Sequence, residues 1–209
     1  MIHIDVISDV ICPWCWIGKR RLEKAIAALG MPVKVRWLPF QLNPTMPKEG
    51  ISRREYRTKK FGSWERSLEL DTQVAAAGRA EGLEFAFDRI ERTPNTVDAH
   101  RLIWFAEIEG IQDGVVEALF RAYFAEGRDI SNRQVILNVI AEAGLDRGKA
   151  EIVLSGDQGT EAIAEAGELL RLHHVDGVPF FIINGQITLS GAQQPEAFVE
   201  AFEQVHARK

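Results

Sequence analysis

The chain has 209 residues, of which 46% are hydrophobic and 26% are charged, and its formal net charge is -5. This length and composition are those of an ordinary globular protein with one or two domains. The negative charge argues against nucleic acid as a partner, and no stretch approaches the roughly eighteen apolar residues of a membrane span.

The amino-terminal residues do not have the pattern of a secretion signal. No basic segment precedes the first apolar stretch, and Asp5 and Asp9 interrupt it. We therefore expect a cytoplasmic protein. Disulfides in that compartment are usually transient and catalytic, not structural.

The first elements alternate between strand and helix. Apolar and polar residues alternate in 2–8 and again in 33–39, which predicts two strands. The stretch 13–29 between them has helical periodicity and ends at Gly30. Because the connection is long enough for a crossover, we expect the two strands to be parallel. The basic residues 19–21 are expected on the solvated face of the helix.

The only two cysteines of the chain stand where the first strand meets the first helix, in Cys12-Pro13-Trp14-Cys15. A Cys-x-x-Cys at such a junction is a redox motif of thioredoxin-like folds. In the first helical turn, unpaired N–H groups and the helix dipole favour the thiolate of Cys12, which is the nucleophilic form. Cys15 lies one turn later, within reach of a disulfide, and Pro13 suits the first helical position.

A zinc site is the main structural alternative for this motif. A closed site needs four ligands, and the chain has no third cysteine. His173 and His174 are adjacent, which is poor spacing for a second pair of ligands. We therefore expect no metal here.

The stretch after Pro39 is almost entirely helical in pattern. Apolar residues recur three and four positions apart in segments near 52–61, 64–82, 95–109, 113–126, 132–144 and 146–155. The basic run from Arg53 to Lys60 is expected to be the wet face of a helix. The stretch 85–90 is compatible with a loop or with a short strand.

The alternation of strands and helices returns after Gly156. The pattern predicts a helix at 160–174, strands at 180–183 and 186–190, and a last helix at 195–207. Asn184-Gly185 between the two strands is a strong hairpin signal, because both turn positions need a positive φ.

Together these elements predict an α/β protein with a thioredoxin-like fold. Its four-stranded mixed sheet would be built from both ends of the chain and interrupted by a large helical insertion. The thioredoxin-like domain would comprise residues 1–44 and 157–209, and the inserted helical domain residues 45–156.

Pro179 stands at the entry of the third predicted strand, where a proline loses no ladder hydrogen bond. We expect a cis peptide bond between Val178 and Pro179. The bend would lie beside the cysteines, and the backbone of Val178 could then pair with an extended substrate.

With these motifs the chain resembles the DsbA-type thioredoxin-fold oxidoreductases, and among them the cytoplasmic FrnE-like branch. The resemblance covers essentially the whole chain. It is carried by the run from Asp9 to Gly18, by the run from Pro94 to Leu102, by Gly177-Val178-Pro179 and by the run from Ser190 to Gln193. Trp14 departs from the family, because periplasmic members usually carry a histidine between the cysteines.

The resemblance implies a thiol–disulfide oxidoreductase or isomerase. Cys12 would be the exposed nucleophile that forms a mixed disulfide, and the buried Cys15 would resolve it. Pro13 and Trp14 would shape the active-site loop, and Val178 and Pro179 the substrate groove. The partners would be proteins or small thiols, a homodimer is compatible with this activity, and no tightly bound cofactor is expected.

The same superfamily implies a second function. The 2-hydroxychromene-2-carboxylate isomerases and the kappa-class glutathione transferases share the insertion and the Gly-Val-Pro element, but typically have a serine in place of Cys12. Two cysteines favour redox chemistry. Glutathione stays a candidate co-substrate, with Val178, Ser190 and Gly191 as candidate contacts. A non-catalytic binding module is a third interpretation, against which the intact cysteine pair speaks.

The helix predicted at 95–109 carries further candidates. Asn95 at its start, and His100 and Trp104 on one face, are expected to line the pocket of the cysteines. The alternative places the aromatic residues of this region in the core: Trp104, Phe105, Phe120, Tyr123 and Phe124.

Overall fold

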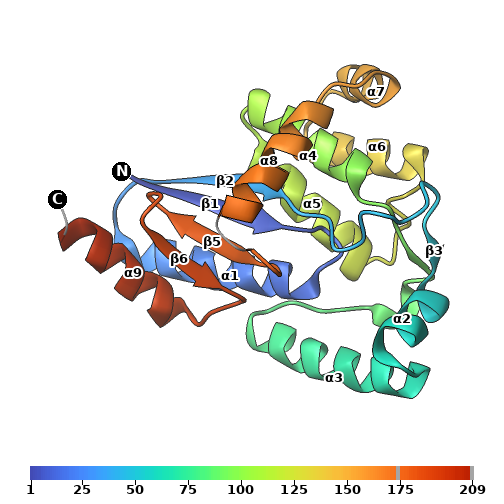
Figure 1. The fold of residues 1–209 in the computed structure, drawn as a ribbon, viewed down its shortest axis with the longest axis horizontal. Coiled ribbons are helices and arrows are strands. Elements are labelled where there is room, and N and C mark those ends of the chain that lie inside the picture. Colours follow the sequence, from blue (N-terminus) through green and yellow to red (C-terminus); the bar gives the residue numbers. More distant parts are fainter. Residues whose placement is uncertain (173–174, 208–209) are drawn as a thin grey trace.

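Four strands form one mixed sheet in the computed structural model, which describes residues 1–172 and 175–207 (Figure 1). The strands are β1 (Ile2–Ser8), β2 (Val33–Pro39), β5 (Phe180–Ile183) and β6 (Ile187–Ser190). Their order is β2–β1–β5–β6, with β1 parallel to β2 and antiparallel to β5. This confirms the predicted thioredoxin-like sheet assembled from both ends of the chain.

Helices fill the chain between and beyond these strands. Their bounds are Pro13–Leu29 (α1), Arg53–Phe61 (α2), Trp64–Ala80 (α3), Val97–Ile108 (α4), Gln112–Phe124 (α5), Arg133–Glu142 (α6), Arg147–Ser155 (α7), Thr160–Leu172 (α8) and Pro195–Ala207 (α9). The predicted segments agree with these bounds to within two residues, except that 173–174, the predicted end of α8, lie outside the described residues. The stretch 85–90 contains a 3₁₀ turn, Phe87–Arg89, in place of the loop or strand considered above.

The sheet buries both of its faces, because successive side chains of a strand point to opposite sides. Val6 and Phe181 belong to the layer that α1 and α9 cover. Ile7 and Phe180 point to the other side, where Leu170 of α8 packs against them. In Figure 1 the sheet accordingly lies between α1 on one side and α8 on the other.

The hairpin between β5 and β6 forms at the predicted turn. Asn184 and Gly185 have φ values of 49° and 67°, as a two-residue turn with positive φ requires. The side chain of Asn184 also accepts a hydrogen bond from the backbone N–H of His3 at 2.8 Å. The turn is thereby fastened to the start of β1.

The helices between β2 and β5 pack on α1 and β2. Trp16 of α1 stacks on Phe120 and Phe124 of α5, with ring centroids 6.3 and 6.2 Å apart. Most of the aromatic residues considered for the core are buried there: Phe105, Phe120, Tyr123 and Phe124. The division into two domains at the boundaries given above stays a prediction. Among the described residues, no helix is long and apolar enough to cross a membrane.

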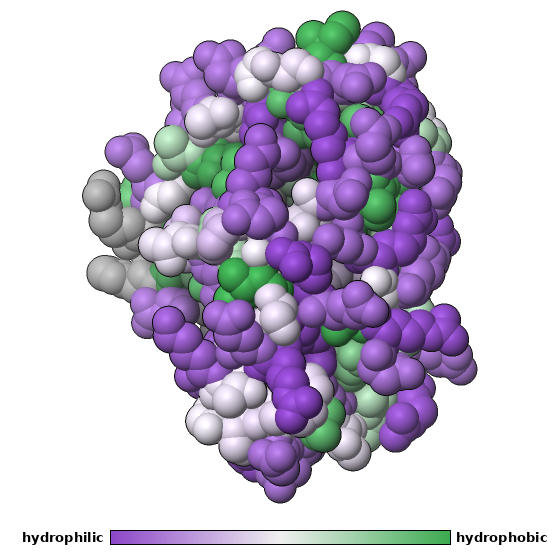
Figure 2. Space-filling view, turned by 90° about the vertical axis from the view of Figure 1, so that its right-hand side faces the viewer, coloured by the Kyte–Doolittle hydropathy of each residue, from purple (hydrophilic) through white to green (hydrophobic). Residues whose placement is uncertain are grey.

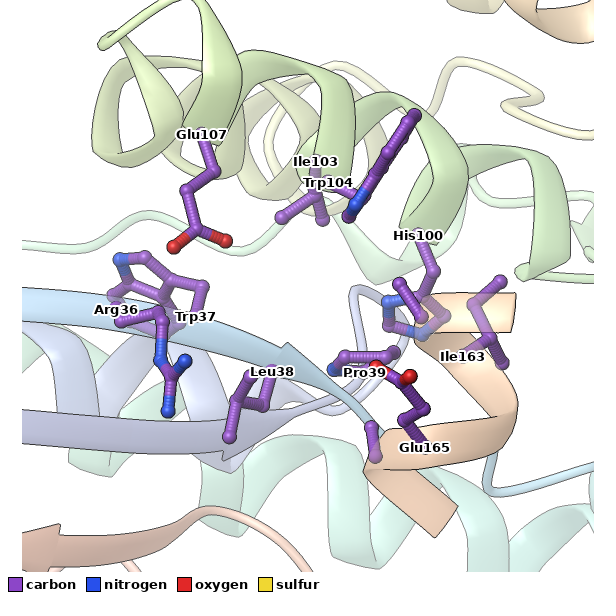
Figure 3. Close-up of a pocket in the computed structure, with 12 residues that line it drawn as sticks. Arg36, Trp37, Leu38, Pro39, His100, Ile103, Trp104, Glu107, Ile163 and Glu165 are labelled. Atoms are coloured by element: carbon purple, nitrogen blue, oxygen red, sulfur yellow. The ribbon is translucent and has the colours of Figure 1, made fainter. Parts of the chain in front are cut away.

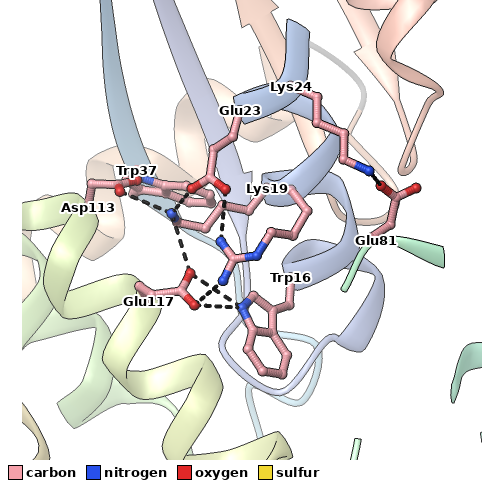
Figure 4. Close-up of polar contacts among 9 residues, drawn as sticks. Trp16, Lys19, Glu23, Lys24, Trp37, Glu81, Asp113 and Glu117 are labelled. Carbon is pink, nitrogen blue, oxygen red and sulfur yellow. Dashed lines mark hydrogen bonds and ion pairs between the residues drawn. The ribbon is translucent and has the colours of Figure 1, made fainter. Parts of the chain in front are cut away.

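The basic residues 19–21 do not form the solvated face expected from the sequence. Lys19 is 2% exposed and its ammonium contacts Glu23, Asp113 at 3.0 Å and Glu117 at 3.4 Å (Figure 4). Two of these carboxylates belong to α5, a hundred residues away in the chain. Lys19 and Arg20, which also contacts Glu117, therefore face α5, whereas Arg21 pairs with Glu81 at 2.7 Å. Helical periodicity cannot distinguish such an interface from a solvated surface.

Candidate active site

The cysteine motif lies where β1 gives way to α1. Cys12 is the N-cap residue of α1, with an extended backbone (φ -96°, ψ 110°), and Pro13 occupies the first turn. The N–H of Cys12 donates to the carbonyl of Asp9 at 2.9 Å, and that of Cys15 donates to the carbonyl of Cys12 at 3.0 Å. These bonds hold the Cys12 side chain at the end of α1 where N–H groups lack helical partners.

The two thiols, both free, differ in how far they are buried. Cys15 is fully buried, and Cys12 is 6% exposed, which is less than the exposed nucleophile that the sequence led us to expect. The Cys12 Sγ donates to the carbonyl of Val178 at 3.5 Å, so the loop before β5 covers it on one side. Trp14, in contrast, is 39% exposed.

The environment of Cys15 favours its protonated form. Burial raises the pKa of the Cys15 thiol well above that of a free thiol, and the neighbouring Cys12 raises it further. The backbone N–H of Asp9 lowers this pKa, whereas the negative charge of its carboxylate raises it. A thiol held in this way stays neutral near pH 7 and needs a proton acceptor before it can attack.

The loop before β5 brings Val178 and Pro179 to the cysteines. Their peptide bond is cis. Gly18 of α1 lies under the proline ring: a Cβ at this position would be 3.0 Å from Pro179 Cγ. At the end of β6, the N–H of Gly191 donates to the carbonyl of Pro179 at 2.8 Å. Gly191 thus braces the loop through its backbone, and neither it nor Ser190 lines the cavity beside Cys12.

Asp9 and His100 form a buried pair next to the motif. Asp9 is fully buried and His100 is 2% exposed. One oxygen of Asp9 accepts from the N–H of Leu42 at 2.8 Å; the other is 3.4 Å from His100 Nε2 and has no hydrogen-bond donor among the described residues. His100 Nε2 is 2.9 Å from the carbonyl of Phe40, which can only accept, so this nitrogen carries a proton.

Sequence reasoning identified His100 but missed Asp9 as its neighbour. The available signal was the position of Asp9, a lone acid between a buried strand and the cysteine motif. His100 also borders a separate cavity of about 270 Å³ between β2, α4 and α8, together with Trp104 (Figure 3). Trp104 therefore faces this second cavity and not the cysteines, contrary to the prediction.

Asn95 has a structural place at the start of α4. Its side chain donates to the carbonyl of Met46 at 2.7 Å and accepts from the N–H of Val97 at 2.9 Å. It fastens the chain after β2 to the beginning of the helix. Like Trp104, Asn95 does not line the cavity beside Cys12, so the expected pocket lining from α4 is not observed.

A cavity of about 310 Å³ opens directly beside Cys12. Residues 11–14 form one wall, and α2 forms another with Arg53, Arg57 and Lys60. Arg53 is 4% exposed, and Arg57 is half-buried. The expectation that this basic run is a wet face is therefore wrong for its inward side. The recurrence of basic residues at 53, 57 and 60 was the signal, since this spacing follows one face of a helix.

Comparison with known proteins identifies the family of the chain. The family model described as "DSBA-like thioredoxin domain" matches residues 3–203. A crystal structure described as a probable DsbA oxidoreductase from Streptomyces coelicolor superposes with a TM-score of 0.93, at 29% sequence identity, and covers 100% of this chain and 92% of that one.

Two further solved structures share the fold at lower sequence identity. One is the cytosolic disulfide reductase DsbM from Pseudomonas aeruginosa with GSH, at a TM-score of 0.68 and 22% identity, covering 99% of this chain and 100% of that one. The other is a 2-hydroxychromene-2-carboxylate isomerase, at a TM-score of 0.70 and 17% identity, covering 99% and 98%. At these identities the likeness is one of fold.

Proposed function

Since the chain belongs to the DSBA-like thioredoxin domain family, we propose that it catalyses thiol–disulfide exchange through Cys12 and Cys15. The observation that carries the proposal is the asymmetry of the two thiols. Cys12 borders a cavity at the start of α1, whereas Cys15 is fully buried one turn later with a raised pKa. One thiol is thus placed to meet a substrate and the other to resolve the adduct.

In the reductive direction the Cys12 thiolate attacks a substrate disulfide. A bond forms between Cys12 and one substrate sulfur, and the other leaves as a thiolate that takes up a proton. Cys15 then loses its proton and attacks Cys12, which releases the second substrate thiolate and leaves a Cys12–Cys15 disulfide. The substrate gains two electrons and the protein loses them; oxidation of a substrate dithiol is the reverse sequence.

Surrounding residues have supporting roles in this scheme. The carbonyl of Val178, which accepts a hydrogen bond from Cys12 Sγ, would pair with the backbone of a bound peptide. Pro13 and Trp14 shape the rim of the cavity. The substrates would be disulfides or thiols of proteins or small molecules in the cytoplasm, with glutathione as a co-substrate; a homodimer is compatible with the scheme.

The first test is an equilibrium redox titration in glutathione buffers, with acid quench, alkylation and a mass readout. We expect one two-electron intramolecular disulfide, and its midpoint ranks the protein as oxidant, isomerase or reductant. A stable glutathione adduct alone, or no oxidation, would contradict the proposal.

A trapping experiment tests the division of labour between the thiols. We expect Cys15→Ser to accumulate mixed disulfides on Cys12, visible on a non-reducing denaturing gel, because nothing resolves them. Cys12→Ser should give none and should abolish turnover. Equal trapping by both variants would contradict the assigned roles.

The alternative is a glutathione-dependent isomerase or transferase, which the shared fold with 2-hydroxychromene-2-carboxylate isomerase supports. That chemistry needs no resolving thiol. Isomerase turnover that survives in Cys15→Ser, with no exchange activity in the wild type, would favour it.

A further inference from the structure

The cavity beside Cys12 is lined by positively charged side chains, although the protein as a whole is acidic. The chain as a whole is acidic, with a formal net charge of -5. Yet the described residues that line the cavity include the cations Arg53, Arg57 and Lys60 and no carboxylate. A concave site lined by one sign of charge attracts ligands of the opposite sign.

One buried carboxylate behind the wall balances only part of this charge. Asp71 contacts Arg53 Nη2 and Arg57 Nη2, each at 2.7 Å. Burial lowers the pKa of Arg57. The negative charge of Asp71 raises this pKa and the positive charge of Arg53 lowers it further, but the net shift is downward. Two guanidinium groups thus share one acid, which leaves an excess of positive charge on the cavity wall.

Lys60 is the cation with the most freedom to meet a ligand. It is exposed, and its ammonium donates to the hydroxyl of Tyr56 at 2.8 Å. Among the described residues it has no carboxylate within ion-pair distance. Its ammonium lies 5.3 Å from the ring centroid of Tyr56 and 5.8 Å from that of Phe61, so aromatic faces position it at the rim.

The remaining walls of the cavity are mostly apolar or aromatic. Trp14 stands next to Cys12, and Phe61, Leu70, Val74 and Phe87 contribute from the helical side. In Figure 2 the lower part of the face, at the height of α2 and α3, mixes hydrophilic, intermediate and hydrophobic side chains. Such a cavity suits a group with an apolar body and a charged end.

We propose that the cavity selects small disulfides in which the group on the reacting sulfur is an apolar or aromatic carboxylate. This inference rests on the proposed thiol–disulfide exchange and names its substrate class. The apolar body lies against the aromatic wall, the carboxylate meets Lys60 at the rim, and the sulfur reaches Cys12. The reaction is the exchange described above: the carboxylate-bearing group is held as a mixed disulfide on Cys12 and leaves as a thiolate when Cys15 attacks Cys12.

The test compares two aromatic disulfides in stopped-flow reactions with the reduced protein: 5,5′-dithiobis(2-nitrobenzoate), which is anionic, and 4,4′-dithiodipyridine, which is neutral. Lys60→Gln should lower the second-order rate constant for the anionic reagent about three- to tenfold, as expected for the loss of one charged contact. The rate constant for the neutral reagent should stay within about twofold. Added salt should shrink the difference.

Lys59→Gln is the matched control. Lys59 is the neighbouring residue of α2, is exposed and carries the same charge, but does not line the cavity. It should leave both rate constants unchanged, while Lys60→Glu should deepen the loss for the anionic reagent. All three substitutions are at two exposed positions of α2, Lys59 and Lys60, so folding should be retained, and circular dichroism checks this.

Two results would overturn the inference. Equal losses for both reagents would mean that Lys60 acts on the reactivity of Cys12 and not on the ligand. Equal effects of Lys59→Gln and Lys60→Gln on the anionic reagent would mean that the positive charge of α2 acts at long range and that Lys60 does not bind the carboxylate. In a Cys15→Ser background, where Cys12 is the only cysteine, the same comparison reads Cys12 alone and is independent of disulfide formation with Cys15. If the redox titration gives the expected disulfide but the two reagents show no selectivity for a carboxylate, the substrate class is rejected and the proposed thiol–disulfide exchange stands.

Discussion

The carboxylate of Asp9 is buried near the Cys15 thiol, and one of its oxygens accepts no hydrogen bond from the part of the chain that the structure describes. A buried polar atom without a hydrogen bond is costly. Burial is the largest cause of the raised pKa of Cys15, and the negative charge of Asp9 adds a smaller increase. In the proposed exchange reaction, Asp9 would therefore influence how readily Cys15 resolves a mixed disulfide.

We predict that Asp9→Asn lowers the pKa of Cys15. The asparagine oxygen can still accept from Leu42 N–H, so the local fold is kept while the charge is removed. The measurement is the thiolate absorbance near 240 nm against pH, in a Cys12→Ser background where Cys15 is the only cysteine. Asp157→Asn, a change at an exposed position, is the control and should leave the titration in place. An unchanged or raised pKa in Asp9→Asn would contradict the prediction.

At the scale of the elements, the site depends on how closely α1 approaches the loop before β5. Gly18 permits this approach, because its missing side chain leaves room for Pro179 and Phe181. A Cβ there would lie 3.0 Å from Pro179 Cγ and 3.2 Å from Phe181 Cζ. The position of the proline ring against α1 thus depends on one glycine of that helix.

We predict that Gly18→Ala destabilises the protein by about 1–3 kcal/mol, the usual cost of overpacking. It should also slow the reaction of Cys12 with disulfides, because the loop that covers Sγ has to shift. Denaturant unfolding and thiol kinetics measure the two effects. Gly114→Ala in α5 is the matched control: its Cβ meets nothing within 4 Å, so helix propensity should make it neutral or stabilising by up to about 1 kcal/mol. Similar losses in both variants would exclude the packing explanation.

At the scale of the whole molecule, the buried thiol links redox state to stability. The folded-state pKa of Cys15 is raised above its unfolded value. Its contribution to stability is therefore complete below about pH 8.5, the ordinary pKa of a thiol, and is lost as the pH rises toward the folded pKa. The disulfide form has no such thiol and lacks this dependence.

We predict that the free energy of unfolding of the reduced protein falls between about pH 8.5 and pH 10, by at most about 1.4 kcal/mol per pH unit for this group. The disulfide form should be flatter in the same window. Burial also raises the pKa of Tyr123, but this effect begins at higher pH and is common to both forms. Urea unfolding at several pH values measures the slopes, and reduced Cys15→Ala should resemble the disulfide form. Parallel slopes in all three would contradict the assignment.

Much of this protein was determined by short-range patterns in its sequence. Alternating apolar residues predicted the first two strands, and Asn184-Gly185 predicted the turn of the β5–β6 hairpin. The Cys-x-x-Cys motif at a strand–helix junction predicted that the two cysteines lie at the start of α1, one turn apart. These features follow from backbone geometry over a few residues, which is why they could be inferred without partners.

Only the tertiary structure decided which charged residues are buried and what they surround. Lys19 and Arg53 both looked like parts of wet helical faces, yet each is buried against carboxylates from other helices, Asp113 and Asp71. The pairing of Asp9 with His100 joins residues ninety positions apart in the same way. A helical period specifies the face on which a residue lies but not what covers that face, because a charge can be buried only where a distant segment supplies its partner.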